Sequence, residues 1–284
     1  MEKPVIRISV RNLVEFILRN GDLESGGTAG DKEAMLKGSR LHRKIQKQMG
    51  SHYQAEVSLK KDTEYEDLIL RVEGRADGIF TQNEKICIDE IKGVYKNLEL
   101  LAEPVLVHRA QALCYAWIYL DDHGLEEIDV QITYAHLDTE MIKRFRETMT
   151  REELESWYQR LLDSYHKWLS YQMKWREERN RSMEKLEFPF IYRKGQKEMV
   201  AGIYHAISRK EQIFIQAPTG VGKTMSAVFP AVRSIGEGKA ETLFYLTAKT
   251  ITRTVAQDAF EILRKNGLLF KTVTITAKEK LCFC

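Results

Sequence analysis

Apolar residues recur along the first part of the chain with two spacings, one typical of helices and one of strands. Leu41, Ile45 and Met49 are four residues apart, so they share one face of a helix. Short runs rich in β-branched and aromatic residues, bounded by turn residues, indicate strands instead. The pattern predicts a short amphipathic helix before a Gly-rich loop at 21–31, helices over 32–49 and 105–121, and strands over 53–60, 67–80, 85–92 and 128–137.

This order of elements predicts an α/β sandwich around a mixed sheet, with a hairpin turn at 81–84 between the second and third strands. A long helix is expected next, over 150–185. Its apolar stripe consists of Leu154, Tyr158, Leu161, Tyr165 and Trp168. The stripe favours a helix packed on its own domain, with a coiled-coil partner helix as the alternative.

The pattern changes near Pro189, which disfavours helix in the residue before it. We therefore predict two domains, 1–185 and 186–284. In the second, strands and helices should alternate, and such alternation indicates a parallel sheet. The predicted strands are 212–217, 241–247 and 270–276, and the predicted helices are 222–236 and 250–265.

Composition is that of an ordinary globular protein, with 43% hydrophobic and 30% charged residues in 284. The formal net charge of +3 neither requires nor excludes nucleic acid, because a local groove can be basic on a balanced protein. The sequence has no signal-peptide pattern, no apolar run long enough to span a membrane, and only four cysteines. These features predict a cytoplasmic protein without structural disulfides. Its oligomeric state is left open.

Residues 217–224, APTGVGKT, have the spacing of a phosphate-binding loop. Gly220 and Gly222 let consecutive backbone N–H groups point at phosphate oxygens. Lys223 can reach the outer phosphates, and the Thr224 hydroxyl can bind Mg²⁺. A surface turn is the alternative, but a predicted strand before the loop and a helix after it favour ATP binding. The predicted ATP contacts are Gln196, Thr219, Gly220, Val221, Gly222, Lys223 and Thr224.

Residues 186–284 resemble the start of the motor of XPD/DinG-like iron–sulfur helicases in superfamily 2. FPFIYRKGQ, which ends at Gln196, is similar to the Q-motif in which a glutamine reads adenine. Residues 246–249 resemble a segment that contacts the DNA backbone in those helicases. The resemblance implies a 4Fe–4S cluster in the complete helicase with Cys282 as its first ligand, whereas two free thiols at Cys282 and Cys284 are the alternative.

An acidic motif that would hold Mg²⁺ and activate water does not follow Thr224 in this sequence. We therefore expect a fragment of a longer protein or a truncated gene product, which binds ATP weakly and does not hydrolyse it at a useful rate. On this expectation the chain holds only the ATP-binding start of a helicase motor, with an incomplete parallel RecA-like domain.

Residues of the first predicted domain suggest a metal site for cutting phosphodiester bonds. Asp77 and Glu90 lie on adjacent predicted strands across a hairpin, so their carboxylates can converge on one cation. Lys92 is two residues beyond Glu90 and shares its face, where it can orient water or stabilise charge. Asp89 should point to the opposite face and is the alternative to Glu90. Arg75 can share the face of Asp77 and meet a phosphate.

Two helices contribute further candidates to this site. His42 lies on the first long helix, where a structural or exposed histidine is the commoner case. An imidazole beside two carboxylates suits Mn²⁺ as well as Mg²⁺. Gln111 and Tyr115 are one helical turn apart and share a face. They either line the same cleft or form a buried amide–phenol pair.

The order GSRLH (38–42), GRAD (74–77), DEIK (89–92) and QALCY (111–115) resembles the RecB-like branch of the PD-(D/E)XK nucleases. The resemblance implies the restriction-endonuclease-like fold and a Mg²⁺ or Mn²⁺ ion. Its implied metal ligands are His42, Asp77, Glu90 and the Ile91 carbonyl, and its implied catalytic residues are Asp77, Glu90, Lys92, Gln111 and Tyr115. Some relatives carry an iron–sulfur cluster here, but Cys87 and Cys114 fall inside predicted core elements, which favours packing.

The sequence thus predicts a metal-dependent DNA nuclease fused to the ATP-binding start of a DNA helicase, acting in repair or DNA processing. Its predicted partners are DNA and ATP, and no association with a membrane is expected. One alternative is a helicase whose nuclease fold grips DNA without cleaving it. Another is a P-loop enzyme that does not act on DNA, such as a small-molecule kinase.

Overall fold

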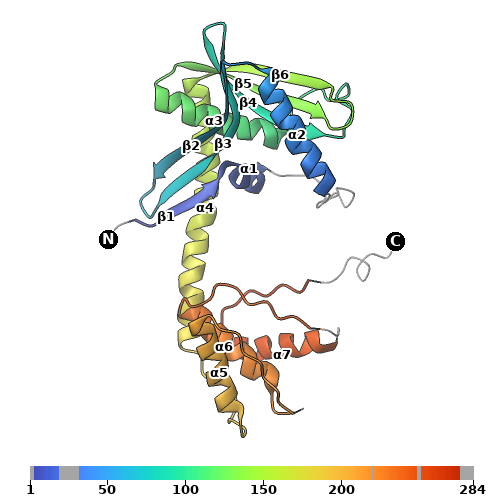
Figure 1. The fold of residues 1–284 in the computed structure, drawn as a ribbon. Coiled ribbons are helices and arrows are strands. Elements are labelled where there is room, and N and C mark those ends of the chain that lie inside the picture. Colours follow the sequence, from blue (N-terminus) through green and yellow to red (C-terminus); the bar gives the residue numbers. More distant parts are fainter. Residues whose placement is uncertain (1–2, 19–31, 219, 248–250, 276–284) are drawn as a thin grey trace. The chain divides into compact units, whose positions relative to one another are not determined.

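The computed structural model describes residues 3–18, 32–218, 220–247 and 251–275 (Figure 1). The chain divides into two compact units, Met1–Ser170 and Tyr171–Cys284. The division falls inside one long helix, α4 (Arg151–Glu184), whereas the sequence places a domain boundary after Lys185. None of the described helices is both long and apolar enough to cross a membrane.

The first unit contains a mixed sheet with the strand order β1-β3-β4-β5-β6, and β2 pairs with β3 as well. Helix α3 packs against β2, β3, β4 and β5, and helix α1 packs against α3 and β3. The elements are β1 (Val5–Ser9), α1 (Val10–Leu18), α2 (Lys32–Gln48), β2 (Tyr53–Glu64), β3 (Ile69–Gln82), β4 (Lys85–Val94), α3 (Leu106–His123), β5 (Glu127–His136) and β6 (Ile142–Thr150). The predicted α/β class and mixed sheet are therefore confirmed for this unit.

Two strands were not predicted. β1 has only five residues, and it pairs parallel to the start of β3. β6 is an edge strand whose sequence, IKRFRETMT, alternates between partly buried and exposed positions without a buried apolar side. Charged edge strands protect a sheet from pairing with other chains, but they lack the apolar alternation that identifies a strand in sequence.

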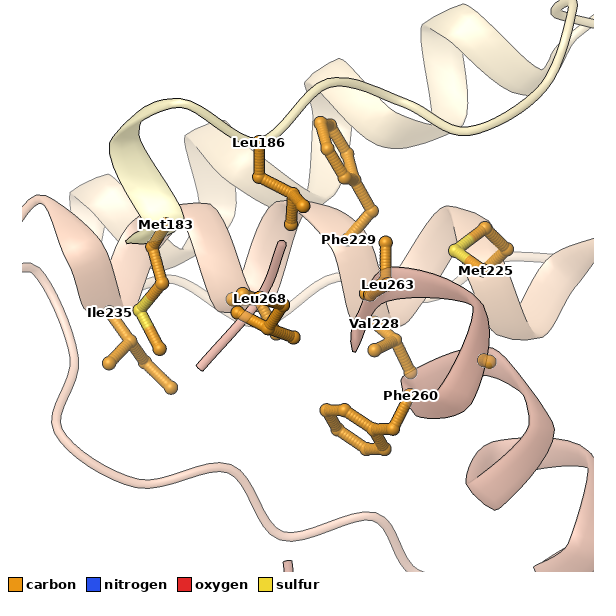
Figure 2. Close-up of a cluster of buried hydrophobic side chains, with 11 residues drawn as sticks. Met183, Leu186, Met225, Val228, Phe229, Ile235, Phe260, Leu263 and Leu268 are labelled. Carbon is orange, nitrogen blue, oxygen red and sulfur yellow. The ribbon is translucent and has the colours of Figure 1, made fainter. Parts of the chain in front are cut away.

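The second unit is built on three helices around one apolar core. They are α5 (Gln196–Arg209), α6 (Lys223–Gly236) and α7 (Ile251–Lys265). The last turns of α4 contribute Met183, which is buried, and Leu186 follows just after the helix. Figure 2 shows these side chains facing residues of α6 and α7 across the core, which comprises Met183, Leu186, Met225, Val228, Phe229, Val232, Ile235, Ala259, Phe260, Leu263 and Leu268.

The parallel sheet predicted for 186–284 is not formed in the part of this unit that the structure describes. The segments 212–217, 241–247 and 270–275 carry no strand pairing there. Most of their apolar side chains are exposed, by 92% at Phe214 and 76% at Phe244, although Leu243 and Phe270 are partly buried against the core. A strand needs hydrogen-bonded neighbours, and these segments have the composition of strands without them. The predicted helices 222–236 and 250–265 are confirmed as α6 and α7, whereas α5 was not predicted.

Candidate functional site

The candidate site of the first unit lies where β3 and β4 separate. One edge of β3 pairs with β2, while the other pairs with β1 at residues 69–73 and with β4 at residues 78–82. The GRAD segment, 74–77, lies between these two pairings. Beyond Gly78↔Asp89 the ladder between β3 and β4 stops, and the Ile91 N–H donates to Asp77 Oδ2 at 2.7 Å instead. The gap places the Asp77 carboxylate beside β4.

His42 and two carboxylates meet at this gap. His42 Nε2 is 3.1 Å from Asp77 Oδ2, and His42 Nδ1 is 3.8 Å from Glu56 Oε1. One ligand atom from each of these three residues lies within 4.8 Å of the other two. Helix α2 holds His42 there because Leu41 and Ile45 on the same helix are buried against Ile91 and Ala135. The resemblance to RecB-like nucleases implied that His42 and Asp77 are neighbours, but it did not include Glu56.

Glu56 lies on β2 directly across from Asp77 in the strand register, between the pairs Ala55↔Gly78 and Val57↔Ala76. It can be found from sequence only once this register is known. Its other contacts are Arg75 Nε at 2.8 Å and Gln46 Nε2, which donates to Glu56 Oε1 at 3.2 Å. Arg75 therefore binds a carboxylate of the site in this structure.

Glu90 is almost completely buried, with 3% of its surface exposed. Lys92 Nζ lies 2.6 Å from Glu90 Oε1, while Glu90 Oε2 has no hydrogen-bond partner among the described residues. Burial raises the pKa of Glu90 to about 7, the charge of Asp77 adds to this rise, and Lys92 opposes it. A buried carboxylate oxygen without a partner is energetically costly, and a bound cation is one way to satisfy it.

The electrostatics of His42 also reflect the nearby acids. Burial lowers the pKa of this imidazole, but the hydrogen bond with Asp77 and the charges of Asp77, Glu56 and Glu90 outweigh burial, so the pKa is raised. The protonated form is therefore stabilised by the same carboxylates that would surround a cation. Only the neutral form has a lone pair to offer a metal ion.

Gln111 and Tyr115 lie on α3, and each is 5% exposed. The phenol of Tyr115 contacts the start of the GRAD segment, because a Cβ on Gly74 would lie 2.6 Å from Tyr115 Oη. Burial raises the pKa of Tyr115, and the charges of Glu90 and Asp77 raise it further. Tyr115 is therefore next to the acidic cluster, and Gln111 is a buried residue one turn away from it.

Asp89 has its own partners on the opposite side of β4. It accepts hydrogen bonds from Thr133 Oγ1 at 2.6 Å, from Tyr53 Oη at 3.1 Å and from Gln131 Nε2 at 3.1 Å. These bonds satisfy the carboxylate without a cation. Asp89 therefore has a structural role here, and it points away from Glu90 as expected for neighbours on a strand.

Cys87 and Cys114 are free and buried, and burial raises the pKa of the Cys114 thiol. Both side chains lie in the core elements where the sequence placed them.

The phosphate loop of the second unit joins an exposed segment to α6, which begins at Lys223. Gly220 and Gly222 have φ of +84° and +76°, in the left-handed region that favours glycine. Lys223 Nζ donates to the carbonyls of Ala217 at 3.0 Å and Pro218 at 2.7 Å. Thr224 Oγ1 is 3.5 Å from the hydroxyl of Tyr245. Thr219 lies outside the described residues.

Gln196 is the first residue of α5 and contacts the phosphate loop directly. Its Nε2 donates to the Val221 carbonyl at 2.7 Å, and its Oε1 accepts from the Arg193 N–H at 2.8 Å. Both ends of the amide are therefore engaged by backbone, and a side chain on Gly222 would collide with Gln196. The predicted DNA-contacting residues 248 and 249, and Cys282 and Cys284, lie outside the described residues.

Comparison with known proteins supports the interpretation of the phosphate loop. Residues 193–281 match the DEAD/DEAH box helicase family. Over 49 residues the chain is 43% identical to "Probable ATP-dependent helicase MJ0942" of Methanocaldococcus jannaschii, which covers 17% of this chain and 7% of that protein. The second unit thus contains a helicase-type ATP-binding segment. The chain spans only a small part of its relative's length.

The chain is also similar to a solved structure titled "Crystal structure of SSO0001". The match covers 55% of this chain and 75% of the chain in that structure. The identity is 18% and the TM-score is 0.36.

Proposed function

We propose that the first unit is a divalent-cation-dependent DNA nuclease with the PD-(D/E)XK fold, which acts beside an ATP-dependent DNA helicase motor. The observation that supports the nuclease is the buried carboxylate oxygen Glu90 Oε2, which has no hydrogen-bond partner in the described part of the chain and lies near the charges of Asp77 and His42. The helicase-type ATP-binding segment supports the motor.

The residues at the gap between β3 and β4 fit a Mg²⁺ or Mn²⁺ ion. Carboxylate oxygens suit both ions, and an imidazole nitrogen suits Mn²⁺ in particular. His42, Asp77, Glu90 and the carbonyl of Ile91 would hold the ion. When bound, such an ion neutralises charge that develops on the phosphate and makes a bound water more acidic.

The surrounding residues have separate roles in this proposal. Lys92, whose ammonium lies 2.6 Å from Glu90 Oε1, favours the charged form of that buried carboxylate and can stabilise charge on the scissile phosphate. Gln111 and Tyr115 line the cleft on the side of α3 and orient the phosphodiester.

The proposed ATP site uses the loop before α6. Lys223 Nζ, which now bonds two loop carbonyls, would exchange these for the outer phosphates of ATP. Backbone N–H groups of Thr219, Gly220, Val221 and Gly222 would hold the inner phosphates, and Thr224 would bind Mg²⁺. Gln196 would read adenine. In the complete helicase, Cys282 would be the first ligand of a 4Fe–4S cluster.

A cleavage assay with end-labelled single-stranded and duplex DNA, in Mn²⁺ and in EDTA, tests the nuclease. The parent should cleave with Mn²⁺ alone. Asp77→Asn should reduce cleavage by at least about 10³-fold and still bind DNA, whereas Asp122→Asn, which alters an exposed carboxylate at the end of α3, should cleave like the parent. If Asp77→Asn cleaved as fast as the parent, the metal assignment would be wrong. DNA binding by the parent without any cleavage would favour a non-cleaving DNA-binding module.

A further inference from the structure

The cations inside the candidate site are already paired with its acids. Arg75 Nε lies 2.8 Å from Glu56 Oε2, and Lys92 Nζ lies 2.6 Å from Glu90 Oε1. Without a bound cation, these acids and Asp77 give the site an acidic character that disfavours phosphate groups. Affinity for a nucleic-acid strand in the absence of the cation is therefore expected from basic side chains outside this set.

Helix α2 carries such side chains next to the site. Arg40, Arg43 and Lys47 are exposed, and none of the three has an ion-pair partner in the described part of the chain. With Lys44 and Gln48 they line one shallow hollow on the helix. We call Arg40, Arg43 and Lys47 the α2 basic ridge; Lys44 is excluded because it pairs with Glu140.

The ridge borders the site because of helix geometry. Arg43 directly follows His42, and Lys47 directly follows Gln46, whose Nε2 donates to the Asp77 carbonyl at 2.9 Å. Successive residues on a helix are about 100° apart, so Arg43 lies about 100° around the helix from His42, and Arg40 and Lys47 lie somewhat farther round on the exposed side. From Arg40 to Lys47 the helix rises about 10 Å, which is the axial span of about three phosphates on one strand of DNA.

We infer that the α2 basic ridge binds the phosphate backbone of the nucleic-acid strand that the acidic cluster is proposed to cleave. The inference rests on the proposed nuclease function for its substrate class. Helix α2 then has two roles: it supplies His42 to the cation site, and it holds the strand beside that site. Contacts to phosphate carry no base information, so this surface gives affinity and register without sequence preference.

The test is a fluorescence-anisotropy titration of the full chain with a labelled single-stranded oligonucleotide in EDTA, at several salt concentrations. The triple variant Arg40→Gln, Arg43→Gln and Lys47→Gln should raise the Kd about tenfold or more. The slope of log K against log salt should become shallower by about 2, because each lost contact to single-stranded DNA removes about 0.7. The cleavage rate at saturating DNA with Mn²⁺ should stay close to that of the parent.

The matched control removes the same charge from another exposed helix, α4, through Arg160→Gln, Lys167→Gln and Lys174→Gln. It should change neither Kd nor slope, and circular dichroism melting should show all variants folded. The inference is overturned if the ridge variant binds like the parent, or if the control loses as much affinity. A parent that binds through the ridge but never cleaves would refute the nuclease and leave the ridge intact.

Discussion

Glu56 has a backbone conformation that a glutamate rarely adopts, with φ of +58° inside strand β2. Such a conformation costs on the order of 1 kcal/mol and persists only where surrounding contacts support it. Here the contacts are Arg75 Nε at 2.8 Å and His42 Nδ1 at 3.8 Å. The strain and the contacts together make Glu56 a candidate fourth side chain of the cation site.

Glu56→Gln keeps the shape of this side chain and removes its charge. If Glu56 contributes to holding the cation, the Mn²⁺ concentration for half-maximal cleavage should rise about 3- to 30-fold, with a smaller change at saturating Mn²⁺. The factor corresponds to a loss of about 0.6–2 kcal/mol. Glu64→Gln, at the exposed end of the same strand, is the control. Identical Mn²⁺ dependence for both variants would remove Glu56 from the site.

His108 predicts a pH effect on stability. Its Nδ1 lies 2.9 Å from the hydroxyl of Tyr134, and burial, aided by the charges of Lys92 and Arg11, lowers its pKa to about 4. The unfolded chain binds this proton near pH 6.5, so stability is lost as pH falls from about 6.5 to about 4. The loss is about 3 kcal/mol at most. Melting temperatures between pH 7 and 4.5 should fall more steeply for the parent than for His108→Gln; parallel curves would contradict this.

At the scale of elements, the contact between β2 and β3 depends on Gly78, which leaves room for the ring of Tyr53. A Cβ on Gly78 would lie 1.8 Å from Tyr53 Cζ, so the tyrosine ring lies against the Gly78 backbone. The same ring stacks on Phe80, and its hydroxyl donates a hydrogen bond to the buried Asp89 carboxylate. Gly78 is therefore needed for the packing of this sheet, because a side chain at this position would collide with Tyr53.

Gly78→Ala should destabilise the first unit by about 2–4 kcal/mol, because the core cannot accept the added methyl group without moving Tyr53. In a Tyr53→Ala background, which removes the ring, the same change should cost much less. Urea unfolding of the four proteins measures the coupling between the two positions. Additive effects would show that Tyr53 does not create the constraint.

The spacing of apolar residues in the sequence predicted the helices and strands that bury an apolar face in the core. β2, β3, β4, α2, α3 and α4 all lie within a few residues of the prediction. β1 was missed because it has only five residues, and β6 was missed because edge pairing, not apolar alternation, makes it a strand. The strands predicted near Phe214 and Phe244 failed for the opposite reason, since apolar sequence alone does not supply a hydrogen-bonded neighbour.

Some residues of the candidate site could likewise be predicted from the sequence, and others could not. The proximity of Asp77 and Glu90 was predictable because the hairpin places both side chains, whereas His42 was included through the resemblance to RecB-like nucleases. Glu56 was not, because its position depends on the register between β2 and β3, which a sequence pattern does not reveal. The unpaired gap at 74–77 is likewise a tertiary property, created when β1 and β4 share one edge of β3.

At the scale of the whole molecule, the two candidate sites lie in different compact units. Asp77 belongs to the unit Met1–Ser170, and Lys223 belongs to the unit Tyr171–Cys284, which has an apolar core of its own. Each site is therefore supported by separate packing. The binding of ATP and the cleavage of a short oligonucleotide should be separable by mutation.

Lys223→Ala should weaken ATP binding about 10- to 100-fold, because a charged hydrogen bond to phosphate contributes about 1.5–3 kcal/mol. The same variant should cleave a short oligonucleotide at the parent's rate, and Asp77→Asn should bind ATP like the parent. Titration with a fluorescent ATP analogue and the Mn²⁺ cleavage assay measure the two activities. Lys197→Ala, on the exposed side of α5, is the control for lost charge. Unchanged ATP affinity in Lys223→Ala would refute the phosphate loop, whereas lost cleavage in that variant would show that the two sites are coupled.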